Sequence, residues 1–232
     1  LGNWFGCSLL FASTIFTKTS YMMNIMADIV PKNAKPLEKI IRKILFYPLL
    51  FFSKRAIYND SEDYQKYQKI FGKKIRYLPT TIDTDLFKPK DKLLCRKKLN
   101  LPFNKEIMIY TGRVDYTKGS DILTELIKIN KDILFIVIGR LVDKKFEAFM
   151  HEKPKNLIYI EKKSSEELVD YYNAADLGYF PQRISGGLGM TTAECMACGV
   201  PAINRKRGGI PESQALFKTE VDVEKTNEEI KK

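Results

Sequence analysis

The sequence predicts an α/β fold whose second half forms a doubly wound parallel sheet, and three observations lead to this class. From residue 106 onward, short apolar runs alternate with segments of helical periodicity, the pattern of a parallel sheet covered by helices. Two glycine-bearing loops, at 112–119 and 185–189, each follow one of these apolar runs. With 232 residues and 44% hydrophobic content, the chain is long enough for more than one domain.

In the first 105 residues, shorter segments with strand and helix patterns also alternate. An apolar run at 7–12 is typical of a buried strand, and we expect irregular structure over 13–35. The elements expected next are a strand at 55–59, a helix at 62–71, a strand at 75–78, a loop at 79–89 and a charged helix at 90–101. The charged helix marks the expected boundary between a domain at 1–89 and a domain at 90–232.

The most apolar stretch lies between residues 39 and 57. Its centre, 44–52, is nine uncharged residues flanked by basic pairs, and it contains Pro48. A bilayer core requires about 20 apolar residues, so this stretch is too short to span one. Either it is a helix that lies in the membrane interface, or it is a core helix kinked at Pro48. We favour the core helix because interior helices are the commoner class.

The second half reads as a regular succession of strands and helices. The expected strands are 107–111, 133–139, 157–160, 177–180 and 200–204. The expected helices are 121–130, 143–150, 164–175 and 190–198. Ser164 and Glu167 have the spacing of a capping box at the start of the third helix, and Gly199 ends the fourth.

Both glycine loops follow strands, so we expect them at the carboxyl edge of the sheet, where such folds bind ligands. The loop 112–119 carries Arg113 and Lys118, a guanidinium and an ammonium suited to a diphosphate. The alternative is that both are ordinary solvated charges.

The loop 185–189 leads directly into the helix at 190–198. Backbone N–H groups and the positive end of the helix dipole make such a junction an anion site. Glu194, near the middle of this helix, has two oxygens that can accept from adjacent ribose hydroxyls. The alternative is a glycine-rich turn followed by a surface glutamate.

Charge and cysteine content restrict the partners. Residues 1–105 hold 20 basic and 8 acidic side chains and so carry +12, whereas residues 106–232 hold 19 and 20 and carry −1. The basic half indicates an anionic membrane surface or nucleic acid, or simply a lysine-rich soluble protein. The four cysteines form no disulfide framework, which fits a reducing cytoplasm. With a single histidine, His151, no metal site is expected.

Five segments, in order, resemble the retaining glycosyltransferases of family 4, which have the GT-B architecture of two Rossmann-like domains. They are P-T-T-I-D-T-D-L-F-K-P at 79–89, R-K-K-L-N-L-P at 96–102, Y-T-G-R-V-D-Y-T-K-G at 110–119, Y-Y-N-A-A-D-L at 171–177 and G-L-G-M-T-T-A-E-C-M-A-C-G-V-P with G-G-I-P-E over 187–212. The resemblance extends from about residue 56 to 212. It implies a donor-binding domain at 90–232, preceded in the sequence by the last part of an acceptor-side domain at 1–89. Because the chain begins at Leu1 and ends in a short charged tail, we expect a piece of a longer protein.

The resemblance also implies roles for individual residues. Arg113 and Lys118 match the catalytic pair that binds the diphosphate of a nucleotide sugar, and Glu194 matches the glutamate that holds the ribose hydroxyls. The remaining donor-binding residues implied by the two loops are Gly112, Gly186, Gly187, Leu188, Gly189, Met190 and Thr191. In one departure, Gly186 stands where the family has a second glutamate that reaches the donor sugar.

The resemblance implies an enzyme that moves a sugar from a nucleotide diphosphate sugar to a glycan or lipid-linked acceptor, with retention and without a metal. Gly186 favours an alternative, a non-catalytic module that only binds the nucleotide sugar. A nucleic-acid-binding protein is the third interpretation, and no nucleic-acid motif supports it. We expect a cytoplasmic protein. If the apolar helix is interfacial, residues 1–57 attach the protein to an anionic membrane surface.

Overall fold

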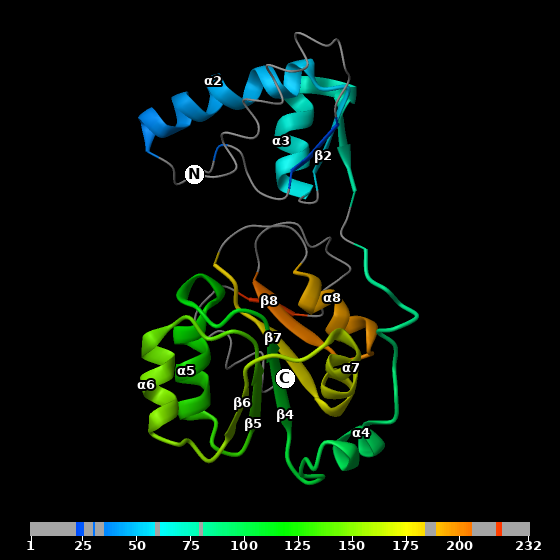
Figure 1. Ribbon diagram of the computed structural model, residues 1–232, viewed down its shortest axis with the longest axis vertical. Coiled ribbons are helices and arrows are strands. Elements are labelled where there is room, and N and C mark those ends of the chain that lie inside the picture. Colours follow the sequence, from blue (N-terminus) through cyan, green and yellow to red (C-terminus); the bar gives the residue numbers. More distant parts are fainter. Residues whose placement is uncertain are drawn as a thin grey trace. The chain divides into compact units, whose positions relative to one another are not determined.

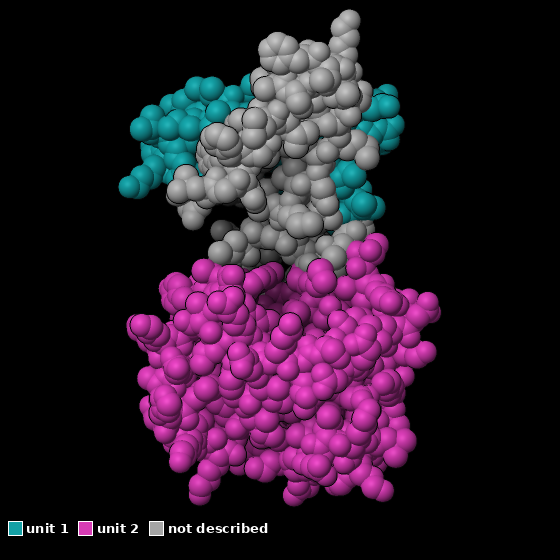
Figure 2. Space-filling model, in the orientation of Figure 1, with its two compact units in different colours: residues 1–80 teal, residues 81–232 magenta. Residues whose placement is uncertain are grey.

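The computed structural model describes residues 22–25, 30, 35–58, 61–78, 81–183, 189–205 and 217–219. Its contacts divide the chain into two compact units, Leu1–Thr80 and Thr81–Lys232, which Figure 2 shows in different colours. This division falls near the start of the loop expected at 79–89, whereas the sequence places the boundary at its end. Phe87, a loop residue, belongs to the second unit because it is buried in that unit's core.

The first unit contains a parallel sheet in the order β1-β2-β3 (Figure 1). Its strands are β1 Met22–Ile25, β2 Arg55–Tyr58 and β3 Ile75–Tyr77. β1 shows that the expectation of irregular structure throughout 13–35 is wrong. All four of its residues pair with β2, so the strand results from tertiary pairing and not from a local pattern. The strand expected at 7–12 lies outside the described residues.

The helices described in the first unit are α2 Pro36–Phe52 and α3 Ser61–Phe71, and a 3-10 turn, Gly72–Lys74, follows α3. Leu50, Tyr58 and Tyr67 form the centre of the core, where the two tyrosine rings stack at 5.1 Å between centroids. None of the described helices combines the length and the hydropathy needed to cross a bilayer.

α2 has one buried face and one exposed apolar face. Leu49 and Leu50 are buried, and Pro48 lies inside the helix. The exposed apolar side chains are Leu37, Ile40, Ile41, Ile44, Leu45, Phe51 and Phe52. The interpretation of the apolar stretch as a core helix is therefore correct for one face only.

The second unit contains a six-stranded parallel sheet in the order β6-β5-β4-β7-β8-β9 (Figure 1). Its strands are β4 Ile107–Thr111, β5 Leu134–Ile138, β6 Leu157–Ile160, β7 Leu177–Phe180, β8 Ala202–Arg205 and β9 Phe217–Thr219. The strand order reverses between β4 and β7, which is the switch point where doubly wound sheets bind ligands. The predicted doubly wound parallel sheet is confirmed.

Helices cover both faces of this sheet, as Figure 1 shows. They are α4 Lys92–Lys98, α5 Ser120–Ile129, α6 Lys144–His151, α7 Ser165–Ala174 and α8 Met190–Ala197. Side chains along β4 alternate between two cores: Ile107 and Ile109 pack with α4, α7 and α8, whereas Met108 and Tyr110 pack with α5 and α6. The capping box of Ser164 and Glu167 is present at the start of α7.

Two glycines allow the loops at the switch point to approach each other closely. Gly119 has a left-handed φ of 81°, and a Cβ there would lie 2.4 Å from the carbonyl oxygen of Pro181, at the end of β7. Gly139 follows β5, and a Cβ there would lie 1.9 Å from the carbonyl oxygen of Gly112. Only glycine therefore fits at either position. These contacts set the loop after β4 against the ends of both neighbouring strands.

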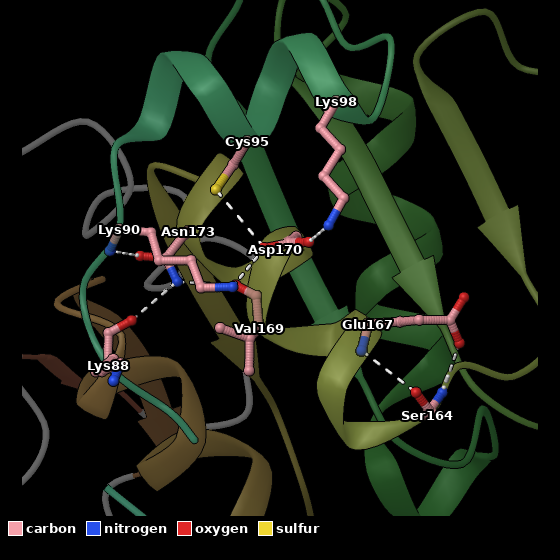
Figure 3. Close-up of polar contacts among 9 residues, drawn as sticks. All are labelled: Lys88, Lys90, Cys95, Lys98, Ser164, Glu167, Val169, Asp170 and Asn173. Carbon is pink, nitrogen blue, oxygen red and sulfur yellow. Dashed lines mark hydrogen bonds and ion pairs between the residues drawn. The ribbon is translucent and has the colours of Figure 1, made fainter. Parts of the chain in front are cut away.

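Two carboxylates, Asp170 on α7 and Asp176 just before β7, join these elements to α4 and the preceding loop. Figure 3 shows the contacts of Asp170. Asp170, buried on α7, pairs with Lys90 at 2.7 Å and also with Lys98. Asp176 accepts from Arg96 at 2.6 Å, and the buried Arg96 also donates to backbone carbonyl oxygens. A buried guanidinium is tolerated only with such partners.

We expect Asp170→Asn to make the free energy of unfolding of the second unit less dependent on pH in acid. Burial raises the pKa of Asp170, but hydrogen bonds and charge from Lys90 and Lys98 outweigh it and lower the pKa below its usual range. A lowered folded-state pKa stabilises the fold above the unfolded value of about 3.9, and this stabilisation is lost as the pH falls through the folded value. The substitution should lower the free energy of unfolding by about 1–2 kcal/mol at neutral pH and flatten its decline in acid.

Urea denaturation at a series of pH values measures this effect, with the exposed Asp132→Asn as control. An acid decline as steep in Asp170→Asn as in the wild type would contradict the assignment.

We expect Gly119→Ala to destabilise the second unit more than Gly199→Ala. Both glycines have a left-handed φ, 81° and 80°, so alanine is strained equally at the two positions. A Cβ at Gly199 meets nothing closer than Pro89 at 3.4 Å, whereas one at Gly119 collides with backbone. The difference in the free energy of unfolding should be about 2 kcal/mol, the usual cost of overpacking. Equal losses in urea denaturation would show that the loop yields without cost.

Candidate functional site

Three segments meet at the carboxyl edge of the second sheet. They are the loop 112–119 after β4, the loop 139–143 after β5 and the segment 181–183 after β7, and β4 pairs in parallel with both β5 and β7. Gly189, before α8, lies beside Gln182. The predicted residues Gly186, Gly187 and Leu188 lie outside the described residues.

Arg113 extends from the first loop into solvent, with a side chain 54% exposed, and pairs with Asp115. Its backbone carbonyl accepts a hydrogen bond of 2.7 Å from the Tyr110 hydroxyl, which anchors the loop to β4. Arg113 also lines an open pocket of about 580 Å³ together with Arg140 and Lys144. Lys118 and Glu194 do not line this pocket, so it does not unite the predicted site residues.

Asp115 organises the turn that carries Lys118. It accepts from the backbone N–H of Lys118 at 3.0 Å, from the Thr117 hydroxyl and from Arg113. Burial raises the pKa of Asp115, but these hydrogen bonds outweigh it and lower the pKa below its usual range. Asp115 was not among the site residues predicted from the sequence, although its spacing from Lys118 is that of an Asp capping a helical turn.

Lys118 is half-buried, and its Nζ donates to Oε1 of Gln182 at 2.9 Å. Burial, followed by the charge of Arg113, lowers the pKa of Lys118, although Asp115 acts in the opposite direction. Gln182 is neutral, so this contact orients the ammonium without cancelling its charge. Arg113 and Lys118 thus lie on one short loop at the edge where the sequence predicts a diphosphate.

Arg183 fastens this loop to the end of β7. Its guanidinium forms two hydrogen bonds with Asp121, of 2.5 and 2.7 Å, and lies 4.3 Å from the centre of the Tyr116 ring. Its backbone N–H donates to the carbonyl of Thr117 at 2.8 Å. Arg183 could not be predicted from local sequence patterns because its partners lie more than sixty residues away along the chain.

Glu194 is not a surface residue, so that alternative is wrong. Its side chain is 8% exposed on α8, and Oε2 accepts a 2.9 Å hydrogen bond from the Tyr172 hydroxyl. Burial raises the pKa of Glu194, and the hydrogen bond from Tyr172 opposes this rise. The carboxylate is therefore held within the protein in a defined position.

α8 begins at Met190, as predicted, directly after Gly189. Gly189 has no side chain with which to cap the helix, and its carbonyl accepts from the N–H groups of Thr192 and Ala193. Thr191 lies in the first turn. Within the part of the chain that the structure describes, no three His, Cys, Asp or Glu side chains are grouped to hold a metal ion.

Residues 91–231 match the family described as glycosyl transferases group 1. A D-inositol 3-phosphate glycosyltransferase from Segniliparus rotundus is 28% identical over 149 residues, which cover 60% of this chain and 33% of that protein. A GDP-mannose-dependent monoacylated alpha-(1-6)-phosphatidylinositol monomannoside mannosyltransferase from Corynebacterium glutamicum is 26% identical over 165 residues, or 64% of this chain and 43% of that one. The chain thus spans less than half the length of these relatives.

Solved structures share the fold. Sucrose-phosphate synthase from Thermosynechococcus elongatus superposes with a TM-score of 0.81 at 21% identity, covering 98% of this chain and 62% of that one. Anabaena HepE in complex with UDP and glucose superposes with a TM-score of 0.79 at 14% identity, covering 98% and 65%. This likeness confirms the predicted α/β fold of GT-B type. Because the family match spans more than half of its residues, the chain belongs to the glycosyl transferases of group 1.

Proposed function

We propose that the full-length protein is a hexosyltransferase of the family 4 type, which moves a sugar from a nucleotide diphosphate sugar with retention of configuration. One observation carries the proposal: Arg113 and Lys118 lie on a loop at the switch point, and a buried carboxylate, Glu194, lies on the helix that follows the neighbouring strand. A nucleoside diphosphate offers the matching groups, since its diphosphate is anionic and its ribose has two adjacent hydroxyls.

In this proposal, Arg113 and Lys118 stabilise the diphosphate as it departs from the sugar. The N-terminal end of α8 adds backbone N–H groups from Met190 and Thr191, and Gly112 and Gly189 leave room for the donor. Charge development on the leaving group is the step that such groups accelerate, and they are oriented before the donor arrives. The donor enters as a substrate, and we expect no metal ion.

The acceptor proposed is a glycan or a lipid-linked sugar. Gly186 keeps a second candidate open, a module that binds the nucleotide sugar without transferring it, because glycine cannot contact a sugar hydroxyl through a side chain. Sugar release from UDP-, GDP- and ADP-sugars by the full-length protein separates the two. Donor binding without release in the presence of acceptor lipids and glycans supports the module.

We also propose that the exposed face of α2 lies on an anionic membrane surface. Its apolar side chains recur at helical spacing, and Lys43, Lys54 and Arg55 are exposed at or near the same helix. A helix of this kind inserts its apolar face below the headgroups, and its cations attract anionic lipids. This membrane-associated, cytoplasmic location rests on α2 and on the +12 carried by residues 1–105.

We expect Arg113→Ala and Lys118→Ala each to weaken nucleoside diphosphate binding by about 1.5–3 kcal/mol, the range for hydrogen bonds to charged groups. Binding of the corresponding nucleoside should change little, because it has no diphosphate. Calorimetric titration of the chain with UDP, GDP and ADP, and with uridine, guanosine and adenosine, measures both.

Lys131→Ala is the control, since Lys131 is an exposed cation just before β5, at the opposite edge of the parallel sheet. If Lys131→Ala weakens diphosphate binding as much as Arg113→Ala or Lys118→Ala does, only general charge attraction is at work. The assignment of Arg113 and Lys118 would then fail.

We expect the chain to bind vesicles that contain phosphatidylglycerol, and to bind them less at high salt. The double substitution Ile41→Glu and Ile44→Glu should abolish this binding without unfolding the protein, because both side chains are exposed on α2. Leu94→Glu, on the exposed surface of α4, is the control and should bind as the wild type does. Co-sedimentation that persists in the double variant, or equally in pure phosphatidylcholine, would refute the role of α2.

A further inference from the structure

A buried chain of hydrogen bonds joins three elements of the second unit. Thr111 is the last residue of β4, Tyr172 lies on α7 and Glu194 lies on α8. The Tyr172 hydroxyl lies 2.7 Å from Oγ1 of Thr111 and 2.9 Å from Oε2 of Glu194. All three side chains are buried. These two hydrogen bonds therefore connect β4, which leads into the loop at Gly112, with α8, which follows the second glycine loop.

The chemistry of the three groups sets the direction of these hydrogen bonds. An ionised carboxylate only accepts, so Tyr172 donates its single proton to Glu194. Tyr172 then accepts from the Thr111 hydroxyl, and each bond polarises the next. The second oxygen of Glu194, Oε1, has no hydrogen-bond partner among the described residues. Tyr172 thus restrains one oxygen of Glu194, and the other keeps its capacity to accept hydrogen bonds.

We propose that Tyr172, supported by Thr111, is a positioning residue that holds one oxygen of Glu194 and so presents the other to the ribose hydroxyls of the donor. This inference rests on the proposed function. A carboxylate attached through two methylene groups rotates unless a neighbour restrains it, and restraint before binding lowers the cost of ordering it. Tyr172 is rigid for this purpose because its ring is fully buried against Phe87.

The same contact influences the charge of Glu194. Burial raises the pKa of Glu194, and the hydrogen bond from Tyr172 lowers it. Among the described residues, the other titratable groups that interact with Glu194 are the thiols of Cys195 and Cys198, and burial raises the pKa of both, that of Cys198 to about 11. Both thiols are therefore neutral near neutral pH. Removal of the Tyr172 hydroxyl should raise the pKa of Glu194, so that the carboxylate protonates at a higher pH.

The test is calorimetric titration of the 232-residue chain with UDP, GDP, ADP and pyrophosphate across roughly pH 5–9, on the alkaline side of the ordinary glutamate pKa. In Tyr172→Phe, affinity for the tightest-binding nucleotide should fall roughly tenfold, the usual size of coupling within a buried network. Pyrophosphate affinity should stay unchanged. The pH at which nucleotide affinity is half lost should rise, since the pKa of Glu194 rises.

Further variants separate positioning from a merely structural role. Thr111→Val, nearly isosteric, should show the same changes to a smaller extent, and Thr111→Ser should restore wild-type binding. Tyr67→Phe removes a buried tyrosine hydroxyl in the first unit, one that accepts from the backbone of Val30, and should leave all four affinities unchanged. In a Glu194→Gln background, Tyr172→Phe should no longer shift the pH dependence.

If Tyr172→Phe binds the nucleotide with wild-type affinity, and if the pH at which this affinity is half lost is unchanged, the role of Tyr172 is overturned but the proposed donor site is not. If Tyr172→Phe does not fold, the two Thr111 variants provide the test. Equal nucleotide affinity in Thr111→Val and Thr111→Ser would overturn the role of Tyr172. Wild-type protein that binds none of the three nucleotides more tightly than pyrophosphate would instead overturn the proposed donor site, and the inference with it.

Discussion

The parallel hydrogen bonding of β4 to both β5 and β7 is the constraint on which the rest of the second unit depends. Parallel pairing brings the carboxyl ends of all three strands to one edge. The strand order reverses at β4 and β7, so that α5, after β4, and α8, after β7, pack on opposite faces of the sheet, which is the arrangement that leaves a ligand crevice at this edge. Gly119 and Gly139 then permit backbone contacts that a Cβ would prevent. The position of Arg113 and Lys118 follows from this arrangement of strands.

Neutral and charged side chains keep the loop after β4 in place, and the ammonium of Lys118 is held by the neutral Gln182 and not by a carboxylate. Asp115 closes the turn, Arg183 ties it to β7, and Gln182 orients the ammonium of Lys118. A site whose polar groups already have partners needs little rearrangement when an anion binds. In the proposed function, this preorganisation serves the stabilisation of a departing diphosphate.

The proposed donor contacts differ in their surroundings, and they should contribute differently. Arg113 is largely exposed, so its attraction for a diphosphate is screened by solvent and salt. Glu194 is buried beside Tyr172, where a hydrogen bond is stronger and an unmade one is more costly. The loop cations would therefore supply attraction for any diphosphate, and the buried carboxylate would supply discrimination for the ribose.

Local patterns in the sequence determined most of the fold. The strands at 107–111, 157–160 and 177–180 have the predicted bounds, and the capping box before α7 formed as expected, because periodicity and capping act over a few residues. The sequence also located Arg113, Lys118 and Glu194 as site candidates. Only the tertiary structure decided that β1 is a strand, that Glu194 is buried and that Tyr172 holds it. Those features depend on pairing between segments far apart in the chain, and no local pattern records which distant partner satisfies a buried polar group.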